Sequence, residues 1–260
     1  YFFQRFNVND GTAADPAAIS FLFNLNTSSH HSLAWNGNRY TVAGVAHPGN
    51  YLLQTRQLTT AGALRPGPTT IVDQAQEIRE PCLLWLAASN RFALAWWDAR
   101  NTADGEVWFQ FLDPDGAAID SAHRVIGVPA GATLRRLRLE AHPDSGFALF
   151  FEDNSQNGHF DQYFTFLDTN GEVDERIPLD PETGRRVMRL SDTPDDVNGF
   201  GVFTDDQGFV VLYYSPDEIN SDQSAVYALA ITSSGAFQAH EDSSTPMLRS
   251  GNYVAVDALD

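Results

Sequence analysis

The sequence predicts an all-β protein, a five-bladed β-propeller whose last blade is closed by the two ends of the chain. Three observations predict it: five segments repeat one pattern, a Gly-containing turn follows each, and no stretch of about 11 residues shows a convincing helical period. The 13 prolines and 19 glycines are spread along all 260 residues, as expected for many short strands joined by turns. An all-β sandwich is the alternative, but a sandwich does not need five equivalent units.

The five repeated segments each consist of a polar or turn-forming pair, an aromatic residue and an apolar run rich in β-formers. The aromatic residues are 52, 55, 62 and 44 positions apart, and the interval from the last round the chain ends to the first is 47. Strands that are buried on both faces read as continuous apolar runs, which face-to-face packing of blades requires. The anchoring aromatic residues are Tyr40, Phe92, Phe147, Phe209 and Tyr253.

A turn glycine lies 22, 24, 24 and 26 residues after the first four aromatic residues, and 18 residues after the fifth when counted across the chain ends. Glycine supplies the positive φ that a tight hairpin needs, and the preceding residue is Asp, Asn or Ser in every turn except that of Ala61. We therefore expect one domain over 1–260, with blade five shared by 1–23 and 246–260. Two strands from 246–258 are expected to pair with two strands from 1–23. The turn glycines are Gly11, Gly62, Gly116, Gly171 and Gly235.

One unit carries a motif that resembles propeller repeats of secreted bacterial proteins. Trp96-Trp97-Asp98-Ala99-Arg100-Asn101 is similar to their apolar strand ending in Trp-x-Asp-x-Arg-Asn, and Asp113-Pro114-Asp115-Gly116 to their Asp-x-x-Gly ending. The next unit keeps the acid at 150–154 but lacks the Arg, and 213–217 departs further. The five-fold organisation is also similar to tachylectin-type lectins, without a close motif match. The resemblance implies an extracytoplasmic, usually non-catalytic propeller and names no ligand.

The excess of acidic residues excludes several classes of binding partner. There are 34 acidic residues and 16 basic ones, and every basic residue is Arg. The formal net charge is −18. This excludes a nucleic-acid scaffold, which needs a basic face, and electrostatic docking on anionic membranes. No apolar stretch approaches the roughly 20 residues that span a bilayer, so we expect no membrane insertion. We expect an extracellular or periplasmic protein whose partner is a neutral glycan or a protein surface.

The single cysteine, Cys82, excludes an internal disulfide, and its place in an apolar run fits a small buried hydrophobic side chain.

The candidate binding site lies in the loops between the second and third strands, which gather at one end of a propeller. These loops are unusually polar at 98–106, 152–161 and 215–222. Loops on a rigid scaffold are where binding residues concentrate. Their side chains suit sugar hydroxyls, with aromatic residues as stacking surfaces, and Ca²⁺ is the candidate cofactor because hard cations take carboxylate oxygens. Solvated loops in an acidic protein are the alternative. The expected ligand-binding residues are Trp35, His47, Trp97, Asp98, Arg100, Asp104, Glu152, Asp153, Asn157, His159, Asp161, Tyr214 and Asp217.

The turns at Asp113–Gly116 and Asp168–Gly171 superficially resemble calcium loops. A full loop needs a bidentate Glu at its twelfth position, where these segments have Arg124 and Leu179. Both turns are therefore expected to be hairpin turns.

For function, the sequence favours a non-catalytic binding or interaction module. One alternative is a five-bladed glycoside hydrolase of arabinanase type, for which Asp98, Glu152, Asp205 and Asp217 are candidate carboxylates. The other alternative is a structural accessory subunit of a larger extracellular assembly. A Gly-x-Ser-x-Gly elbow, a paired-His zinc helix and a phosphate-binding glycine loop are all absent from the sequence.

Overall fold

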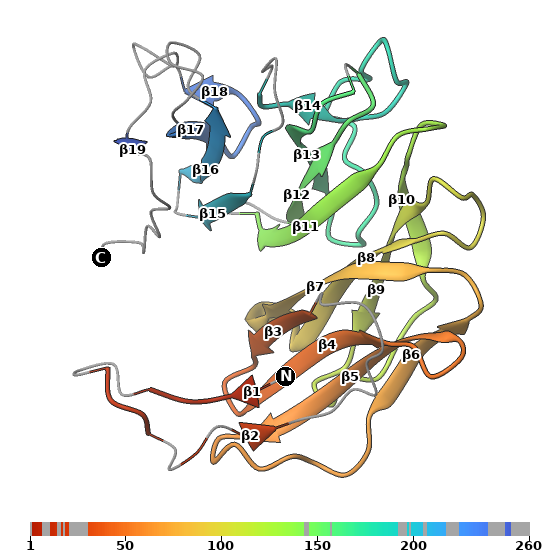
Figure 1. Ribbon diagram of the computed structural model, residues 1–260, viewed down its shortest axis with the longest axis vertical. Helices are drawn as coiled ribbons and strands as arrows, with labels where there is room; N and C mark the ends of the chain where they lie inside the picture. Colours follow the sequence, from red (N-terminus) through yellow and green to blue (C-terminus); the bar gives the residue numbers. More distant parts are fainter. Residues whose placement is uncertain are drawn as a thin grey trace. The chain divides into compact units, whose positions relative to one another are not determined.

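The protein is all-β (Figure 1), and a computed structural model describes residues 2–6, 11–14, 17, 19–20, 31–142, 146–156, 158–191, 197, 199–204, 207–216, 224–238 and 248–250. Over these residues the single helical element is the 3₁₀ turn η1, Ala87–Ser89. The chain divides into two compact units, Tyr1–Arg124 and Val125–Asp260, with the boundary inside one strand.

Unit 1 is built from antiparallel sheets in which strands that are consecutive in the chain are also neighbours. The β3–β6 sheet has the order β3-β4-β5-β6, and the β7–β10 sheet has the order β7-β8-β9-β10. A two-stranded sheet joins β1 (Phe2–Phe3) to β2 (Ile19–Ser20). The other strands are β3 (His31–Trp35), β4 (Arg39–Ala46), β5 (Tyr51–Thr59), β6 (Thr69–Gln74), β7 (Ile78–Leu86), β8 (Arg91–Asp98), β9 (Glu106–Leu112) and β10 (His123–Gly127).

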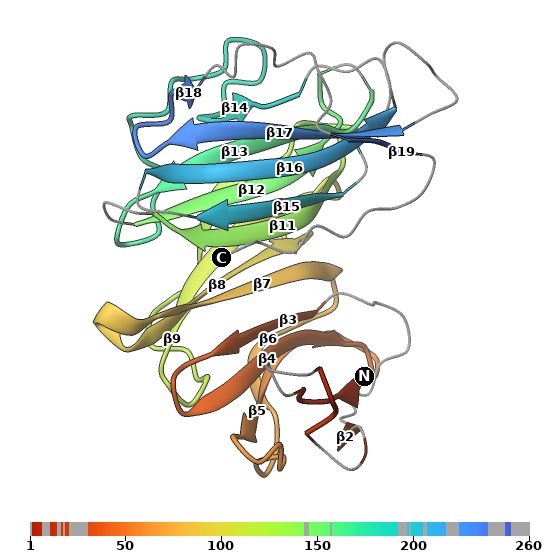
Figure 2. The same ribbon diagram turned by 90° about the vertical axis from the view of Figure 1, so that its left-hand side faces the viewer.

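Unit 2 repeats this meander twice. The β11–β14 sheet follows chain order, and so does the β15–β18 sheet, with β19 as an additional strand on β17. Figure 2 shows β15, β16 and β17 side by side in that order. The strands are β11 (Leu134–Ala141), β12 (Phe147–Asp153), β13 (Asp161–Leu167), β14 (Met188–Arg189), β15 (Phe200–Thr204), β16 (Gly208–Pro216), β17 (Ser224–Thr232), β18 (Phe237–Gln238) and β19 (Leu248–Ser250).

Within each unit the two large sheets share an apolar core. In unit 1, Val45 and Leu53 of the β3–β6 sheet pack with Phe92 and Trp96 of the β7–β10 sheet. In unit 2 one core cluster joins side chains of both sheets, among them Phe150, Phe164, Phe166, Phe209 and Val211. The second strands β8 and β12 are buried at nearly every position. This explains their continuous apolar runs, because both faces of each strand are covered.

Four of the predicted turns have one geometry. In each, the amide of the first residue donates to the carbonyl four residues on, with N···O distances of 2.9, 2.8, 2.7 and 2.9 Å. The glycine in the fourth place has a φ of 78°, 81°, 84° or 84°, in the left-handed region that favours glycine. The hairpin interpretation is therefore confirmed. The turns are Thr59–Gly62, Asp113–Gly116, Asp168–Gly171 and Thr232–Gly235.

The predicted closure of the chain ends differs from the structure at one segment. The strand β19 pairs with β17, Ser224 opposite Ser250, and within the described part of the chain β1 pairs with β2 and not with β19. The reason is that the two-residue β18 covers only Ala230 and Ile231 of β17 and leaves the edge at 224–226 free to pair. The anchoring Tyr253 and the rest of 251–260 lie outside the described residues.

Candidate functional site

The carboxylate of Asp98 lies at the polar end of unit 1, where β8 ends. Asp98 pairs in register with Glu106, the first residue of β9, and its side chain is fully buried. It accepts five hydrogen bonds: from Gln74 Nε2 (2.8 Å), from Trp96 Nε1 (3.0 Å), and from the backbone N, Nε and Nη2 of Arg100 (2.8, 2.9 and 2.5 Å). Burial by itself would raise the pKa of Asp98, but the hydrogen bonds from Arg100, Gln74 and Trp96 outweigh it and lower that pKa below its ordinary value.

Glu106 is held in the same way. Its two oxygens accept from Arg124 Nη1 on β10 at 2.9 Å and from Asn101 Nδ2 at 2.6 Å. Only 4% of its side chain is exposed. The end of the hairpin between β8 and β9 is therefore closed by two buried, paired carboxylates.

Unit 2 repeats this arrangement. Asp153 and Asp161 are register partners at the end of β12 and the start of β13. Asp153 accepts from Arg185 Nη1 at 2.8 Å, and Asp161 accepts from Arg189 Nη2 on β14 at 2.5 Å. Asp161–Arg189 matches Glu106–Arg124 of unit 1, since in both pairs the acid begins the third strand of its sheet and the Arg lies on the fourth.

Glu152 is the most heavily bonded carboxylate of unit 2. It accepts from Arg135 Nε and Arg136 Nη1, both at 2.5 Å, from Gln162 Nε2 at 3.0 Å and from the backbone N of Gly199 at 2.8 Å. A general acid must reach the proton it transfers, and a sugar contact must have a free lone pair. These fully buried, paired acids stabilise the strand ends, and the catalytic roles expected of Asp98 and Glu152 stay predictions.

The first strands of two sheets carry equivalent β-bulges. The register shifts between Arg79 and Cys82 in β7, and between Arg135 and Arg138 in β11. Inside these shifts Glu80 has a φ of 53° and Arg136 a φ of 55°. Positive φ is strained for such residues and occurs often at functional sites, and bulges re-aim side chains beside active sites.

Glu80 lies at the same end of unit 1 as Asp98, because Ile78 and Arg79 are the register partners of Asp98 and Trp97. Its side chain is half-buried. Sequence reasoning did not single out Glu80. The signal was Pro81, because proline inside a strand indicates an edge or a bulge.

The predicted aromatic residues do not form one stacking surface. Trp97 is 2% exposed and is covered by the guanidinium group of Arg79, 3.8 Å from its ring. Trp35 is 40% exposed but lies beside the hairpin between β3 and β4, whereas His47 follows the opposite end of β4. His47 stacks on Tyr51, with 4.0 Å between ring centroids. The expectation that Trp35 joins the polar loops is wrong.

The remaining predicted residues fall into three sets. Arg100 stacks on Trp108 at 4.1 Å, and Asp104 is half-buried at the same end of unit 1. His159 is exposed in the segment between β12 and β13 of unit 2. Tyr214 is described only as a backbone position paired with Val226, and the residues outside the described part of the chain are Asn157, Asp205 and Asp217.

Ca²⁺ was the cofactor expected at these acids. Within the ranges that the structure describes, no group of three or more His, Cys, Asp or Glu side chains is arranged to hold a metal ion. The same part of the chain has no helix whose length and hydropathy would suit a membrane crossing.

Comparison with known proteins gives structural similarity at low sequence identity. No family model and no curated protein matches the chain. An α-L-arabinanase of Penicillium chrysogenum in complex with arabinobiose aligns with a TM-score of 0.58 at 12% identity, over 86% of this chain and 69% of that one. An α-L-arabinofuranosidase of Fusarium graminearum in complex with an iminosugar inhibitor aligns at 0.56 and 11%, over 87% and 69%. An endo-arabinase of Bacteroides thetaiotaomicron aligns at 0.53 and 14%, over 85% and 83%.

The shared feature is a β-propeller-like, all-β fold. Each of these similar structures is a glycoside hydrolase. This finding contradicts the expectation of a non-catalytic binding module and favours the hydrolase that was its alternative.

Proposed function

We propose that this protein is a glycoside hydrolase that acts on arabinan-like glycans, with Glu80 as one of its reacting carboxylates. The observation that carries the proposal is the position of Glu80: a half-buried acid, on a strained bulge of a first strand, at the polar end of unit 1. The similar arabinanase and arabinofuranosidase folds support the reaction class.

The chemistry needs a carboxyl group that is held rigidly and can exchange a proton with the substrate. Glycoside hydrolysis uses a pair of carboxyl groups, one giving a proton to the leaving oxygen and the other acting as base or nucleophile. Asp98 and Glu106 form ion pairs with Arg100 and Arg124. The β-bulge places Glu80 outside the regular register of β7. The half-buried Asp104 is proposed as a contact to the sugar hydroxyls.

Hydrolysis is tested by reducing-sugar release from linear arabinan and from xylan. Glu80→Gln keeps the size of the side chain but cannot exchange a proton, so we expect a loss of roughly 100-fold or more. Glu77→Gln is the matched control, because Glu77 is an exposed carboxylate three residues away, and it should keep full activity. Full activity in a folded Glu80→Gln variant, or no release from either polymer by the unmodified protein, would overturn the proposal.

The finer architecture is also a proposal: five blades, with the fifth built around β1 and β2. The support is the isolated bridge Phe6↔Ala13, which flanks Gly11 (φ 66°). The bridges Leu58↔Leu64, Leu112↔Ala118 and Leu167↔Val173 likewise flank three of the other turn glycines, Gly62, Gly116 and Gly171.

An extracytoplasmic location is proposed from the resemblance of 96–101 to repeats of secreted bacterial propellers. A neutral glycan is the partner that this location and the hydrolase fold share. Recovery of the protein from a periplasmic or culture-fluid fraction would support the location, and recovery from the cytoplasm alone would refute it.

A further inference from the structure

A polar cleft of about 440 Å³ lies at the opposite end of unit 1 from Asp98. Its walls are Thr55, Gln57, Thr69, the Arg65–Gly67 segment and Asp115. Asp115 belongs to the turn after β9, at the Phe92–Leu112 end of its sheet, whereas Asp98 and Glu106 form the other end. The cleft is therefore separate from the proposed catalytic end, and its volume is within the range of about 300–1,000 Å³ of small-molecule sites.

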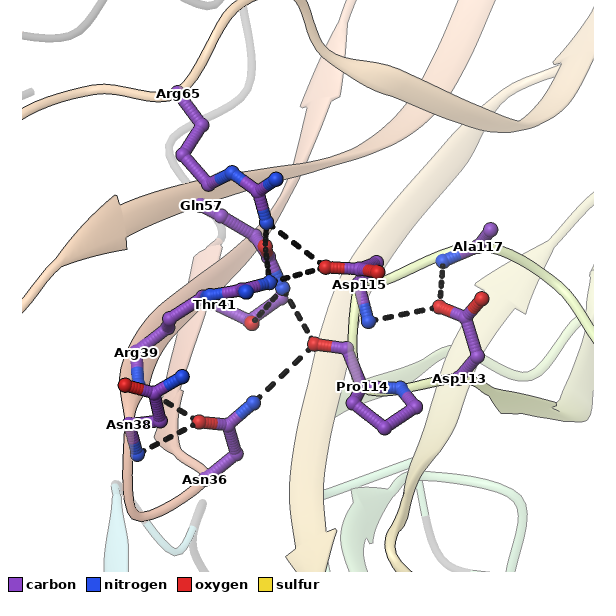
Figure 3. A network of polar contacts seen from close by, with 10 residues as sticks. All are labelled: Asn36, Asn38, Arg39, Thr41, Gln57, Arg65, Asp113, Pro114, Asp115 and Ala117. Atoms are coloured by element: carbon purple, nitrogen blue, oxygen red, sulfur yellow. Dashed lines mark hydrogen bonds and ion pairs between the residues drawn. The ribbon is translucent and has the colours of Figure 1, made fainter.

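Gln57 lines the cleft and lies at the centre of a network of polar contacts (Figure 3). Its Nε2 donates to the carbonyl of Pro114 at 2.7 Å and to Thr41 Oγ1 at 3.2 Å, and its Oε1 accepts from Arg39 and Arg65 at 3.2 and 2.9 Å. These bonds join the β3–β6 sheet to the turn that carries Asp115. The arrangement is pre-organised, which lowers the entropic cost of binding.

Two guanidinium groups converge on one carboxylate oxygen. Arg39 and Arg65 both donate through Nη1 to Oδ1 of Asp115, as Figure 3 shows. Asp115 is the most exposed of the three, with 63% of its side chain accessible against 28% for Arg39 and 41% for Arg65. Hydrogen bonds from Arg65 and Arg39 lower the pKa of Asp115 below its ordinary value.

Neither guanidinium group uses its full capacity. Among the described residues, Nε and Nη2 of Arg39 and of Arg65 have no hydrogen-bond partner. The nearby Asp113 is turned to the backbone amides of Asp115 and Ala117 at 2.9 Å and does not neutralise them. A guanidinium fork matches a carboxylate through two parallel N–H···O bonds, and Arg65 lines the cleft with such a fork unfilled.

We propose that this cleft binds a carboxylate-bearing sugar, a uronic acid, whose carboxylate bonds to the unfilled Nε and Nη2 of Arg65, next to Asp115 on Nη1. The hydroxyl of Thr69 and the free oxygen of Asp115 suit the sugar hydroxyls. This would be a second binding site, separate from the site proposed for hydrolysis of neutral glycans. It would bind the acidic residues of a glycan that contains both neutral and acidic sugars.

The test is calorimetry of the full-length protein with galacturonic acid trisaccharide. We expect Arg65→Gln to weaken binding about tenfold or more, because it removes a charge-assisted bond. Asp115→Asn should strengthen binding, because it removes a negative charge next to the bound carboxylate. Arg176→Gln is the matched control: Arg176 is also a part-exposed arginine paired with an aspartate (Asp174, 2.8 Å), but in unit 2. Binding by Arg176→Gln and by Glu80→Gln should equal that of the unmodified protein.

Three further measurements make the result decisive. Sodium acetate and neutral arabinotriose should bind much more weakly than the acidic trisaccharide, which separates a uronic acid from any carboxylate or any sugar. Should Arg65→Gln unfold, Arg65→Lys keeps the charge but lacks the fork and should bind with reduced affinity. No binding of the trisaccharide at 10 mM, equal binding of arabinotriose, or unchanged binding by a folded Arg65 variant would overturn the site while leaving the hydrolase proposal intact.

Discussion

At the scale of single residues, the acids of this protein differ in burial and in backbone conformation. Asp98 is chemically the same group as Glu80, but it is fully buried and accepts five hydrogen bonds, whereas Glu80 is half-buried on a bulge. Burying a charge is costly unless it is paired and hydrogen-bonded. Asp98 therefore contributes to stability, and Glu80 is the acid proposed to react.

The acid stability of the protein should depend on Asp98. Its pKa is lowered in the folded state, so its contribution is present above the ordinary carboxyl pKa near 4 and is lost as the pH falls through the lowered value. Asp98→Asn should cost about 2 kcal/mol at pH 7. The difference from the unmodified protein should shrink below about pH 4. Urea unfolding between pH 7 and pH 3 measures both effects.

Asp115→Asn is the matched control for Asp98. Its carboxylate is also ion-paired, but it is 63% exposed, so the substitution should cost less than about 1 kcal/mol. Equal costs for the two variants at pH 7 would contradict the assignment of Asp98 as a buried structural acid.

At the scale of elements, two loops between second and third strands each contain a glycine with a positive φ. The two glycines share one backbone conformation but differ in what surrounds them. Gly105 and Gly158 both have a φ of 81°. A Cβ on Gly105 would lie 2.0 Å from Trp97 Cε2, whereas a Cβ on Gly158 would meet no atom within 4 Å. Substitutions at these two positions therefore allow the cost of backbone strain to be measured apart from the cost of disturbing side-chain packing.

We expect Gly158→Ala to cost about 1 kcal/mol from strain alone. Gly105→Ala should cost a further 1–3 kcal/mol or so, because the buried indole has to move. Thermal unfolding of the two variants, with near-UV circular dichroism reporting on the tryptophan environment, measures the difference. Similar unfolding temperatures would show that Trp97 does not need the close approach.

The elements were largely predictable from local sequence. The four turns follow from glycine at a position that needs positive φ, and β8 and β12 follow from runs that only strands covered on both faces would have. The bulge at Glu80 was only partly predictable from the sequence, because Pro81 indicates an interruption of the strand but not the direction of a side chain. Trp35 was misplaced, because an exposed aromatic residue at the end of a strand does not show at which end of the sheet it lies.

At the scale of the whole molecule, the proposed five-bladed architecture predicts that the two ends of the chain close the fifth blade. A propeller that closes leaves no long sheet edge exposed. If 251–260 contribute to the fifth blade, removing them should lower the unfolding temperature by several degrees, as expected from a loss of about 1–2 kcal/mol. Asp257→Asn with Asp260→Asn in the full chain is the control for charge. An unchanged unfolding temperature and protease resistance after truncation would refute closure by these residues.

The sequence by itself determined the all-β class, the repeat, the turns and the acidic net charge, because these follow from composition or from chemistry within a few neighbouring residues. The tertiary structure decided which carboxylates are structural. The partners of Asp161, Asp153 and Glu152 include Arg189, Arg185 and Gly199, which lie 28, 32 and 47 residues away. A carboxylate without a partner and one neutralised by a distant arginine read identically in a sequence. Only folding brings the arginine to the acid, so the ion pairs that fix these carboxylates at the strand ends are a property of the tertiary structure.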